Sequence, residues 1–177
     1  IYHITNLTDN AGCSGSSSGI LVTNIVSTNV TIAPVSDMCE NDPSIILSSG
    51  QPAGGIYKIN NLVSSFINTS LLGQGTHNIE YIFTNSFGCI DSSSTTFNIN
   101  PTTIVQLNPI NDLCKSDSAL NLNQGQPVGG FYVLNGDTIT MIAPNIYSAG
   151  NYTIGYTYIN SYGCASYQSD NFMIYDN

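Results

Sequence analysis

The chain has 177 residues, of which 41 % are hydrophobic, two are Lys or Arg and 11 are Asp or Glu, so its formal net charge is −9 at pH 7. Two cations cannot form the basic surface that phosphate backbones require, which excludes nucleic acid as a partner. The negative net charge also disfavours binding to anionic membranes. Alternating apolar and polar residues predict a folded chain, and the absence of an apolar run of about 18 residues predicts no membrane insertion. Because the chain starts abruptly at Ile1 with no basic leader, we interpret it as a fragment of a longer protein.

The sequence repeats itself with a period of 75 residues. Two motifs recur at this spacing: Gly-Gln-Pro-x-Gly-Gly-x-Tyr at 50–57 and 125–132, and Asn-Ser-x-Gly-Cys at 85–89 and 160–164. Residues 8–13 resemble the second motif, one residue out of period. We therefore expect residues 1–25 to be the C-terminal part of an upstream repeat, followed by a first repeat at 26–100 and a second at 101–177.

Both repeats have the alternating pattern of β-strands. Ile79, Tyr81 and Phe83 alternate with polar residues in the first repeat, and 152–158 does so in the second. The strands expected in the second repeat are Thr103–Leu107, Ala119–Asn123, Gly130–Leu134, Thr138–Ile142, Asn151–Ile159 and Tyr167–Tyr175. Asn135-Gly136 predicts a tight hairpin turn. Short strands of this density favour an all-β fold of tandem immunoglobulin-like β-sandwich repeats, with Phe97, Ile99, Phe172 and Ile174 in the cores.

Five cysteines permit two regular pairing schemes. One scheme closes each repeat internally, Cys39 with Cys89 and Cys114 with Cys164, and leaves Cys13 unpaired in the fragment. The other joins Cys13 with Cys39 and Cys89 with Cys114. If the strands between Cys114 and Cys164 alternate in direction, both cysteines lie at the same end of the domain, which favours the internal scheme. Either scheme implies an oxidising, extracellular compartment.

Residues suited to catalysis are few. His77 aligns with Tyr152 of the second repeat and Glu80 with Gly155, so neither has a counterpart for a shared role. We interpret His77 as a strand residue on a partly exposed face, and no catalytic motif occurs. The sequence therefore predicts no enzyme, and without CxxC spacing it predicts no zinc site.

Carboxylates surround the first cysteine of each repeat. Asp37, Glu40 and Asp42 flank Cys39, and Asp112 and Asp117 flank Cys114. Such a cluster is a candidate calcium site that would stiffen a junction between modules, although acidic loops are also typical of solvent-facing connections.

Two tripeptides match a short Asp-Ser/Thr-aliphatic pattern. Asp117-Ser118-Ala119 and Asp137-Thr138-Ile139 resemble the O-glycosylation site of Bacteroidetes extracytoplasmic proteins. The resemblance makes Ser118 and Thr138 candidate glycan acceptors.

The composite pattern Cys…Gly-x-Pro-x-Gly-Gly-x-Tyr…Gly-x-x-x-Ile-x-Tyr…Asn-x-x-Gly-Cys…Phe-x-Ile is similar to the Ig-like repeats of giant secreted and cell-surface proteins of Bacteroidetes, Flavobacterium-like organisms among them. This resemblance implies type IX secretion and a role in adhesins of surface attachment and gliding motility. It also implies the internal cysteine pairing.

We expect a non-enzymatic stalk or spacer of a large extracellular adhesin or surface filament, whose partners are neighbouring repeats of the same chain, surface glycans or other adhesin chains. The alternative is a glycan- or protein-binding module, in some cases appended to a secreted enzyme, with Phe87, Tyr147 and Tyr162 on its loops. A stalk should show the same surface on each copy, whereas a binding module should carry one distinct patch.

Overall fold

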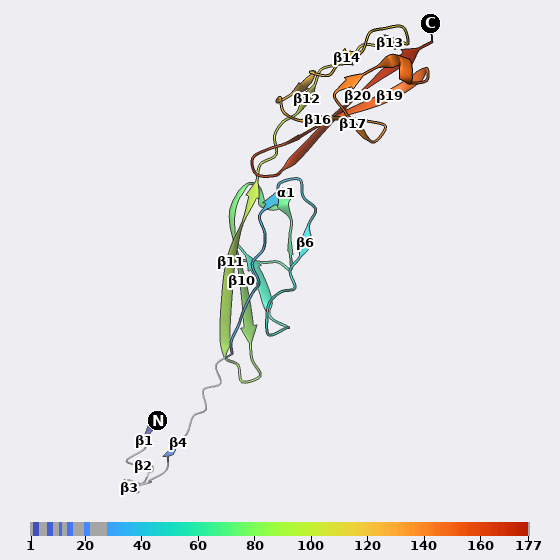
Figure 1. Cartoon of the computed structure of the whole chain (residues 1–177). Helices are drawn as coiled ribbons and strands as arrows, with labels where there is room; N and C mark the ends of the chain where they lie inside the picture. Colours follow the sequence, from blue (N-terminus) through green and yellow to red (C-terminus); the bar gives the residue numbers. More distant parts are fainter. Residues whose placement is uncertain are drawn as a thin grey trace.

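The computed structural model describes residues 28–176 and, before them, Ala11 and four short strands (Figure 1). These strands are β1 (Tyr2–His3), β2 (Leu7–Thr8), β3 (Ser14–Gly15) and β4 (Ile20–Leu21); β1 pairs with β4 and β2 with β3, both antiparallel. Cys13, expected to lack a partner, lies outside the described residues.

The first repeat contains a five-stranded sheet in the order β5-β11-β10-β7-β8. Its strands are β5 (Met38–Cys39), β7 (Ile56–Ile59), β8 (Leu62–Val63), β10 (Gly75–Thr84) and β11 (Ile90–Asn100). Strand β5 pairs in parallel with the end of β11, and the other pairs are antiparallel. The opposing layer contains β6 (Ile45–Ile46) paired with β9 (Phe66–Ile67), followed by the short helix α1 (Thr69–Leu72).

The second repeat has the same topology, with its sheet in the order β13-β20-β19-β16-β17. Its strands are β13 (Leu113–Cys114), β16 (Phe131–Leu134), β17 (Asp137–Ile139), β19 (Gly150–Ile159) and β20 (Ala165–Tyr175). The opposing layer pairs β12 (Gln106–Leu107) with β15 (Gly125–Gln126) and β14 (Leu120–Asn121) with β18 (Met141–Ile142). A 3-10 turn, η1 (Pro144–Ile146), takes the place of α1.

Each repeat has its own apolar core between the two layers. In the first, Ile67, Ile79 and Phe97 are at most 1 % exposed, and in the second Ile142 and Ile154 are fully buried. The inward positions expected at the last strands, Phe97, Ile99, Phe172 and Ile174, all lie in these cores. The expected all-β class with immunoglobulin-like β-sandwiches is confirmed.

The long hairpin strands match the expected ranges, whereas the short strands do not. Asn135 and Gly136, with φ of 53° and 90°, connect β16 to β17 as predicted. Of the expected strand Thr103–Leu107 only β12 is paired, and Thr138–Ile142 divides into β17 and β18, which pair with different layers. Strands β13 and β15 were not predicted, because two-residue strands are too short to show a period.

The recurrent glycine motif surrounds a buried tyrosine of the long hairpin. The hydroxyl of Tyr156 accepts a hydrogen bond from the Gly130 amide at 2.8 Å and donates to the Pro127 carbonyl at 2.5 Å. The Gly125 amide donates to the hydroxyl of Tyr132, whose ring packs 4.8 Å from that of Tyr156. The first repeat has the same arrangement around Tyr81. The motif is therefore explained by packing.

The expectation that His77 lies on a partly exposed face is wrong, because this side chain is only 6 % exposed. Its Nδ1 lies 2.9 Å from Asn60 Nδ2 and its Nε2 lies 3.0 Å from the Gly73 carbonyl, so Nε2 carries the donated proton. The ring also packs 5.5 Å from that of Phe97. Both ring nitrogens are bonded, which lets the imidazole close one end of the core.

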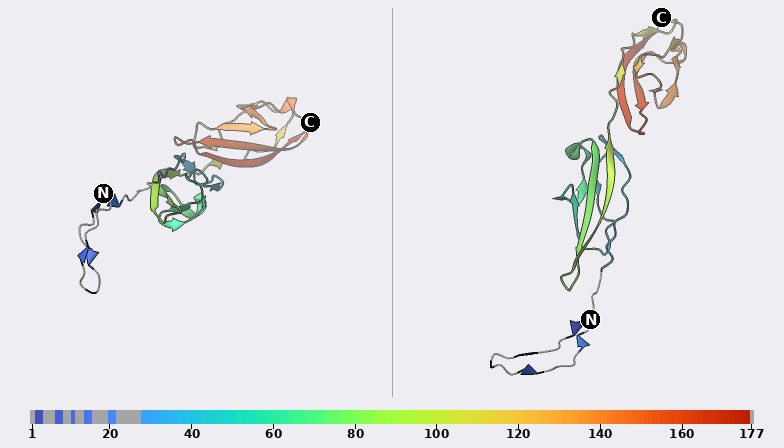
Figure 2. Two further views of the ribbon diagram at one scale, coloured as in Figure 1. Left: turned by 90° about the horizontal axis from the view of Figure 1, so that it is seen from below. Right: turned by 90° about the vertical axis from the view of Figure 1, so that its left-hand side faces the viewer.

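The two repeats lie end to end, and the chain passes from the end of β11 directly into the second repeat (Figures 1 and 2). The C-terminus lies at the far end of the second repeat. Within the part of the chain that the structure describes, no helix has the length and apolar character needed to cross a membrane.

Candidate functional site

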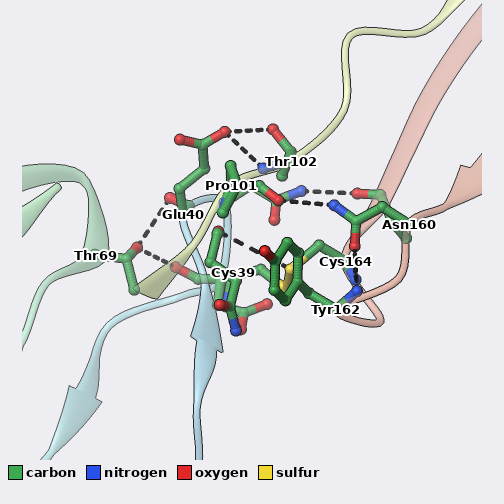
Figure 3. The surroundings of a disulfide bond; sticks show 12 residues. Cys39, Glu40, Thr69, Pro101, Thr102, Asn160, Tyr162 and Cys164 are labelled. Atoms are coloured by element: carbon green, nitrogen blue, oxygen red, sulfur yellow. Dashed lines mark hydrogen bonds between the residues drawn. A yellow bond between two sulfur atoms is a disulfide. The ribbon is translucent and has the colours of Figure 1, made fainter. Parts of the chain in front are cut away.

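A disulfide bond crosses the junction between the two repeats (Figure 3). It joins Cys39, at the end of β5, to Cys164, in the turn between β19 and β20, with 5.6 Å between their Cα atoms. Cys164 is fully buried, and 125 residues separate the two cysteines in sequence. The bond thus links neighbouring repeats, and Cys89 and Cys114 are free.

The expected internal pairing of Cys39 with Cys89 and of Cys114 with Cys164 is wrong. The parallel pairing of β13 with β20 places Cys114 opposite Tyr175, whereas Cys164 precedes the first residue of β20. A strand of that length extends about 35 Å at about 3.3 Å per residue, far beyond the reach of a disulfide. Cys39 and Cys89 are likewise at opposite ends of β11.

The alternative scheme fails as well. Since Cys39 is bonded to Cys164, it cannot pair with Cys13. Cys89 precedes β11 at one end of the first repeat, and Cys114 lies beside Tyr175 at the far end of the second. The second scheme did join consecutive repeats, but the observed pair of Cys39 with Cys164 was in neither scheme.

The segment around Cys39 is fixed by its own polar groups. The Cys39 amide donates to Asp42 Oδ2 at 2.7 Å. The hydroxyl of Thr69, which is 1 % exposed, lies 3.1 Å from the Glu40 carbonyl and 2.9 Å from that of Asp42. These bonds hold the backbone at Cys39 and over the three residues after it, so Cys39 is presented at the start of a fixed loop.

The turn that carries Cys164 is organised by Asn160. Its Oδ1 accepts from the amides of Tyr162 and Cys164, each at 3.0 Å, and its Nδ2 donates to the Pro101 carbonyl at 2.8 Å. Gly163 has φ of 84°, a left-handed conformation that favours glycine. The Asn-x-x-Gly-Cys motif therefore fixes the turn and, through Pro101, anchors it to the linker.

Two further hydrogen-bond contacts connect the repeats beside the disulfide. Asn41 Nδ2 donates to the Ala165 carbonyl at 3.1 Å. Glu40 Oε1 accepts from the amide of Thr102 at 2.9 Å and from its hydroxyl at 2.5 Å, while Oε2 accepts from Gln74 at 2.7 Å. Figure 3 shows the Glu40–Thr102 and Asn160–Pro101 bonds on either side of the linker. The bridge and these bonds restrict bending and rotation at the junction.

Hydrogen bonds from the Thr102 hydroxyl, the Gln74 amide and the Thr102 backbone lower the pKa of Glu40 from 4.5 to about 2. A depressed pKa means that the ionised carboxylate stabilises the junction above pH 4.5 and that this contribution is lost as pH falls to about 2. We expect the Thr102 amide proton to shift in an NMR pH titration with a midpoint near pH 2. Glu40→Gln should abolish this transition, and a midpoint near 4.5 would contradict the assignment.

The structure does not gather the predicted calcium ligands into one site. Within residues 28–176, no group of three or more acidic, His or Cys side chains is placed to hold a metal. Asp37 accepts from the Asn98 amide and Asp112 from the Met173 amide, each at 2.8 Å. Asp42 and Asp117 cap the loops after their cysteines. Asp37 and Asp112 thus fasten the segments that precede the cysteines to β11 and β20, the last long strand of each repeat, and calcium binding stays a prediction from sequence.

The predicted glycan acceptors lie on the surface. Ser118 is exposed in the connection between β13 and β14, and Thr138 is exposed in β17. Their modification stays a prediction.

The aromatic residues expected on loops fall into two groups. Phe87 and Tyr162 occupy equivalent turns and are 76 % and 63 % exposed. Tyr147 is half-buried, with its ring 5.5 Å from that of Tyr152. Both repeats thus present an exposed aromatic ring on the same turn.

The chain matches no protein-family model, and no curated protein matches it. Solved structures similar to it include the Bacteroides ovatus mixed-linkage glucan utilization protein SGBP-B in complex with a heptasaccharide, at 18 % identity and a TM-score of 0.31 over 81 % of this chain and 43 % of that one. A Ca²⁺-stabilized adhesin with which an Antarctic bacterium binds ice is similar at 13 % identity and a TM-score of 0.43, over 97 % and 56 %. Immunoglobulin domains 1–4 of Sidekick-1 are similar at 10 % identity and a TM-score of 0.33, over 96 % and 57 %. The chain thus spans about half the length of these structures.

Proposed function

We propose that this chain is a stalk segment, a non-enzymatic spacer of a large extracellular adhesin or surface filament. The observation that carries the proposal is the disulfide between Cys39 and Cys164, which fixes one repeat to the next. The end-to-end arrangement of the repeats gives length, and the bridge beside the linker gives stiffness. The same bridge supports an oxidising compartment outside the cytoplasm.

The mechanism of stiffening differs from the one that internal disulfides would give. Without the bridge, the repeats would be joined by the linker at Pro101 and by hydrogen bonds that are exposed or only partly buried, which compete with water. With it, the backbone and the disulfide form two covalent connections side by side. Two connections allow far less bending than one, so a series of such junctions keeps a stalk extended.

The resemblance to Bacteroidetes repeats supports a narrower proposal, that the chain belongs to type IX secretion cargo of the adhesin or gliding class. The Cys, Gly-x-Pro-x-Gly-Gly and Asn-x-x-Gly-Cys positions all have structural roles here, in the bridge, the tyrosine packing and the turn. Surface glycans or other adhesin chains are the proposed external partners.

Residual dipolar couplings and ¹⁵N relaxation, measured on ¹⁵N-labelled protein, test the spacer role. In the oxidised chain, both repeats should give one alignment tensor and tumble together. In the Cys39→Ser/Cys164→Ser variant, each repeat should keep its fold and give its own tensor. Cys89→Ser/Cys114→Ser is the matched control and should behave as the wild type. Independent tumbling of the repeats in the oxidised wild-type chain would refute the proposal.

The second candidate function is a binding module that recognises glycans or proteins through its aromatic turns. The observation in its favour is the 76 % exposure of Phe87. Titration of a mixed-linkage glucan oligosaccharide should then shift the Phe87 amide signal, and Phe87→Ala should remove the response.

A further inference from the structure

The two free cysteines of the described residues occupy the positions that form the disulfide in the other repeat. With the period of 75 residues, Cys114 is equivalent to Cys39 and Cys89 is equivalent to Cys164. Cys39 and Cys164 are bonded to each other, whereas both of their counterparts are exposed and free. Residues 28–176 thus contain one complete bridge between the repeats, and an unpaired bridge cysteine at the outer end of each repeat.

The half at Cys89 is built like the one at Cys164. Asn85 Oδ1 accepts from the amides of Phe87 and Cys89 at 2.9 and 3.0 Å, matching the bonds of Asn160. Gly88 has φ of 80°, close to the 84° of Gly163. The turn already has the bonded conformation, although its thiol has no partner.

The half at Cys114 is built like the one at Cys39. The Cys114 amide donates to Asp117 Oδ2 at 2.7 Å, the same distance as from Cys39 to Asp42. The amide of the next residue, Lys115, donates to the Tyr175 carbonyl at 3.0 Å, as the Glu40 amide does to Asn100. The Cys114 loop therefore already has the conformation of the bonded Cys39 loop, although its thiol is free.

The two halves face away from each other along the molecule. Cys114 lies beside Tyr175, near the C-terminal end of the second repeat, and Cys89 precedes β11 at the opposite end of the first. A contact between two different surfaces does not form a closed symmetric pair. When it is repeated, each contact adds one more repeat in the same direction.

We propose that each half receives a further repeat of the same kind. Cys114 bonds to the turn cysteine of a following repeat, and Cys89 bonds to the β5-type cysteine of a preceding repeat. The inference deepens the proposed spacer function and rests on it: the bridge becomes a recurring link between each repeat and the next.

Bond formation requires an oxidant of the disulfide class, such as glutathione disulfide. One thiolate attacks the oxidant and displaces glutathione, and the second thiolate then attacks the mixed disulfide and displaces another. Two protein thiols are oxidised to one disulfide while one glutathione disulfide is reduced to two glutathione thiols.

The polar contacts of the new junction at Cys114 differ from those of the observed one. Lys115 occupies the position equivalent to Glu40 and forms an ion pair with Asp176 in its own repeat. The bridge is therefore the component that all junctions share.

An extended chain tests the proposal. Residues 1–175 are followed directly by a second copy of residues 101–177, which places the added copy of Cys164 at 125 residues from Cys114, the separation of the observed bridge. The added copy carries Ser169→Thr at an exposed position, so that its Cys164 peptide differs in mass from the original one. After refolding with reduced and oxidised glutathione, free thiols are alkylated and Asp-N peptides are identified by mass spectrometry. We expect a disulfide between Cys114 and the added Cys164, alongside the Cys39–Cys164 bridge.

Cys114→Ser in the extended chain is the matched control, in which the added Cys164 should become alkylated. If the added Cys164 is alkylated in the unsubstituted extended chain while Cys39–Cys164 is intact, the inference is overturned and the spacer proposal stands. If Cys39–Cys164 itself is absent, the spacer proposal loses its basis. A dispersed NMR spectrum of the added repeat ensures that either result comes from folded protein.

Discussion

Removing the inter-repeat bridge by Cys39→Ser/Cys164→Ser is expected to lower the free energy of unfolding by up to about 5 kcal/mol. The bridge closes a covalent loop across a sequence separation of 125 residues, which encloses most of both repeats. On the chain-entropy model, closing a loop of this length removes enough freedom from the unfolded chain to give about 5 kcal/mol. The full effect applies when both repeats unfold in one transition.

The measurement is equilibrium denaturation in urea, followed by circular dichroism and by NMR signals of each repeat. The oxidised chain should unfold with coincident transitions, and the variant should unfold earlier, with the repeats separating into two transitions. Cys89→Ser/Cys114→Ser replaces the same number of cysteines at equivalent positions but breaks no disulfide, so its urea midpoint should stay unchanged. Equal midpoints for the two double variants would contradict the prediction.

Gly125→Ala is expected to destabilise the second repeat by about 3 kcal/mol. A Cβ at this position would lie 2.5 Å from ring carbons of Tyr156, closer than van der Waals contact permits. The ring cannot move aside easily, because it is 1 % exposed and its hydroxyl is bonded to Gly130 and Pro127. Overpacking of such a core position costs about 1–3 kcal/mol.

Hydrogen exchange of amides in β16 and β19 of the second repeat, and in β7 and β10 of the first, gives the local stability of each repeat. Protection should fall in the second repeat of Gly125→Ala and change little in the first, where Gly50 packs on Tyr81 in the same way. Val128→Ala, a change at a 74 % exposed side chain of the same loop, should leave protection within about 0.5 kcal/mol of the wild type. Unchanged protection in Gly125→Ala would show that Tyr156 repacks freely.

The long strands and cores could be predicted because period-two alternation continues over many residues in β19 and β20. The Asn135-Gly136 turn could be predicted because both residues tolerate positive φ. His77 could not be placed correctly, since its burial depends on Asn60 and on the Gly73 carbonyl, which come from other parts of the chain.

The junction could not be predicted from cysteine spacing. Spacing does not determine connectivity, and the parity argument assumed that the strands between Cys114 and Cys164 alternate in direction, with Cys114 at the start of the first of them. In the structure this segment is a two-residue strand that runs parallel to the end of β20. One signal was available: the Asn of the Asn-x-x-Gly-Cys motif recurs with the cysteine, and Asn160 both shapes the turn and contacts the linker.

The position of the bridge also determines whether a single proteolytic cut separates the two parts of the chain. Every peptide bond between Cys39 and Cys164 lies inside the covalent loop that the bridge closes. A single cut there, for example in the exposed connection at Ser118, produces two polypeptides that the sulfur atoms still hold together. Any segment attached beyond either repeat therefore stays covalently connected after an isolated cut between these two cysteines.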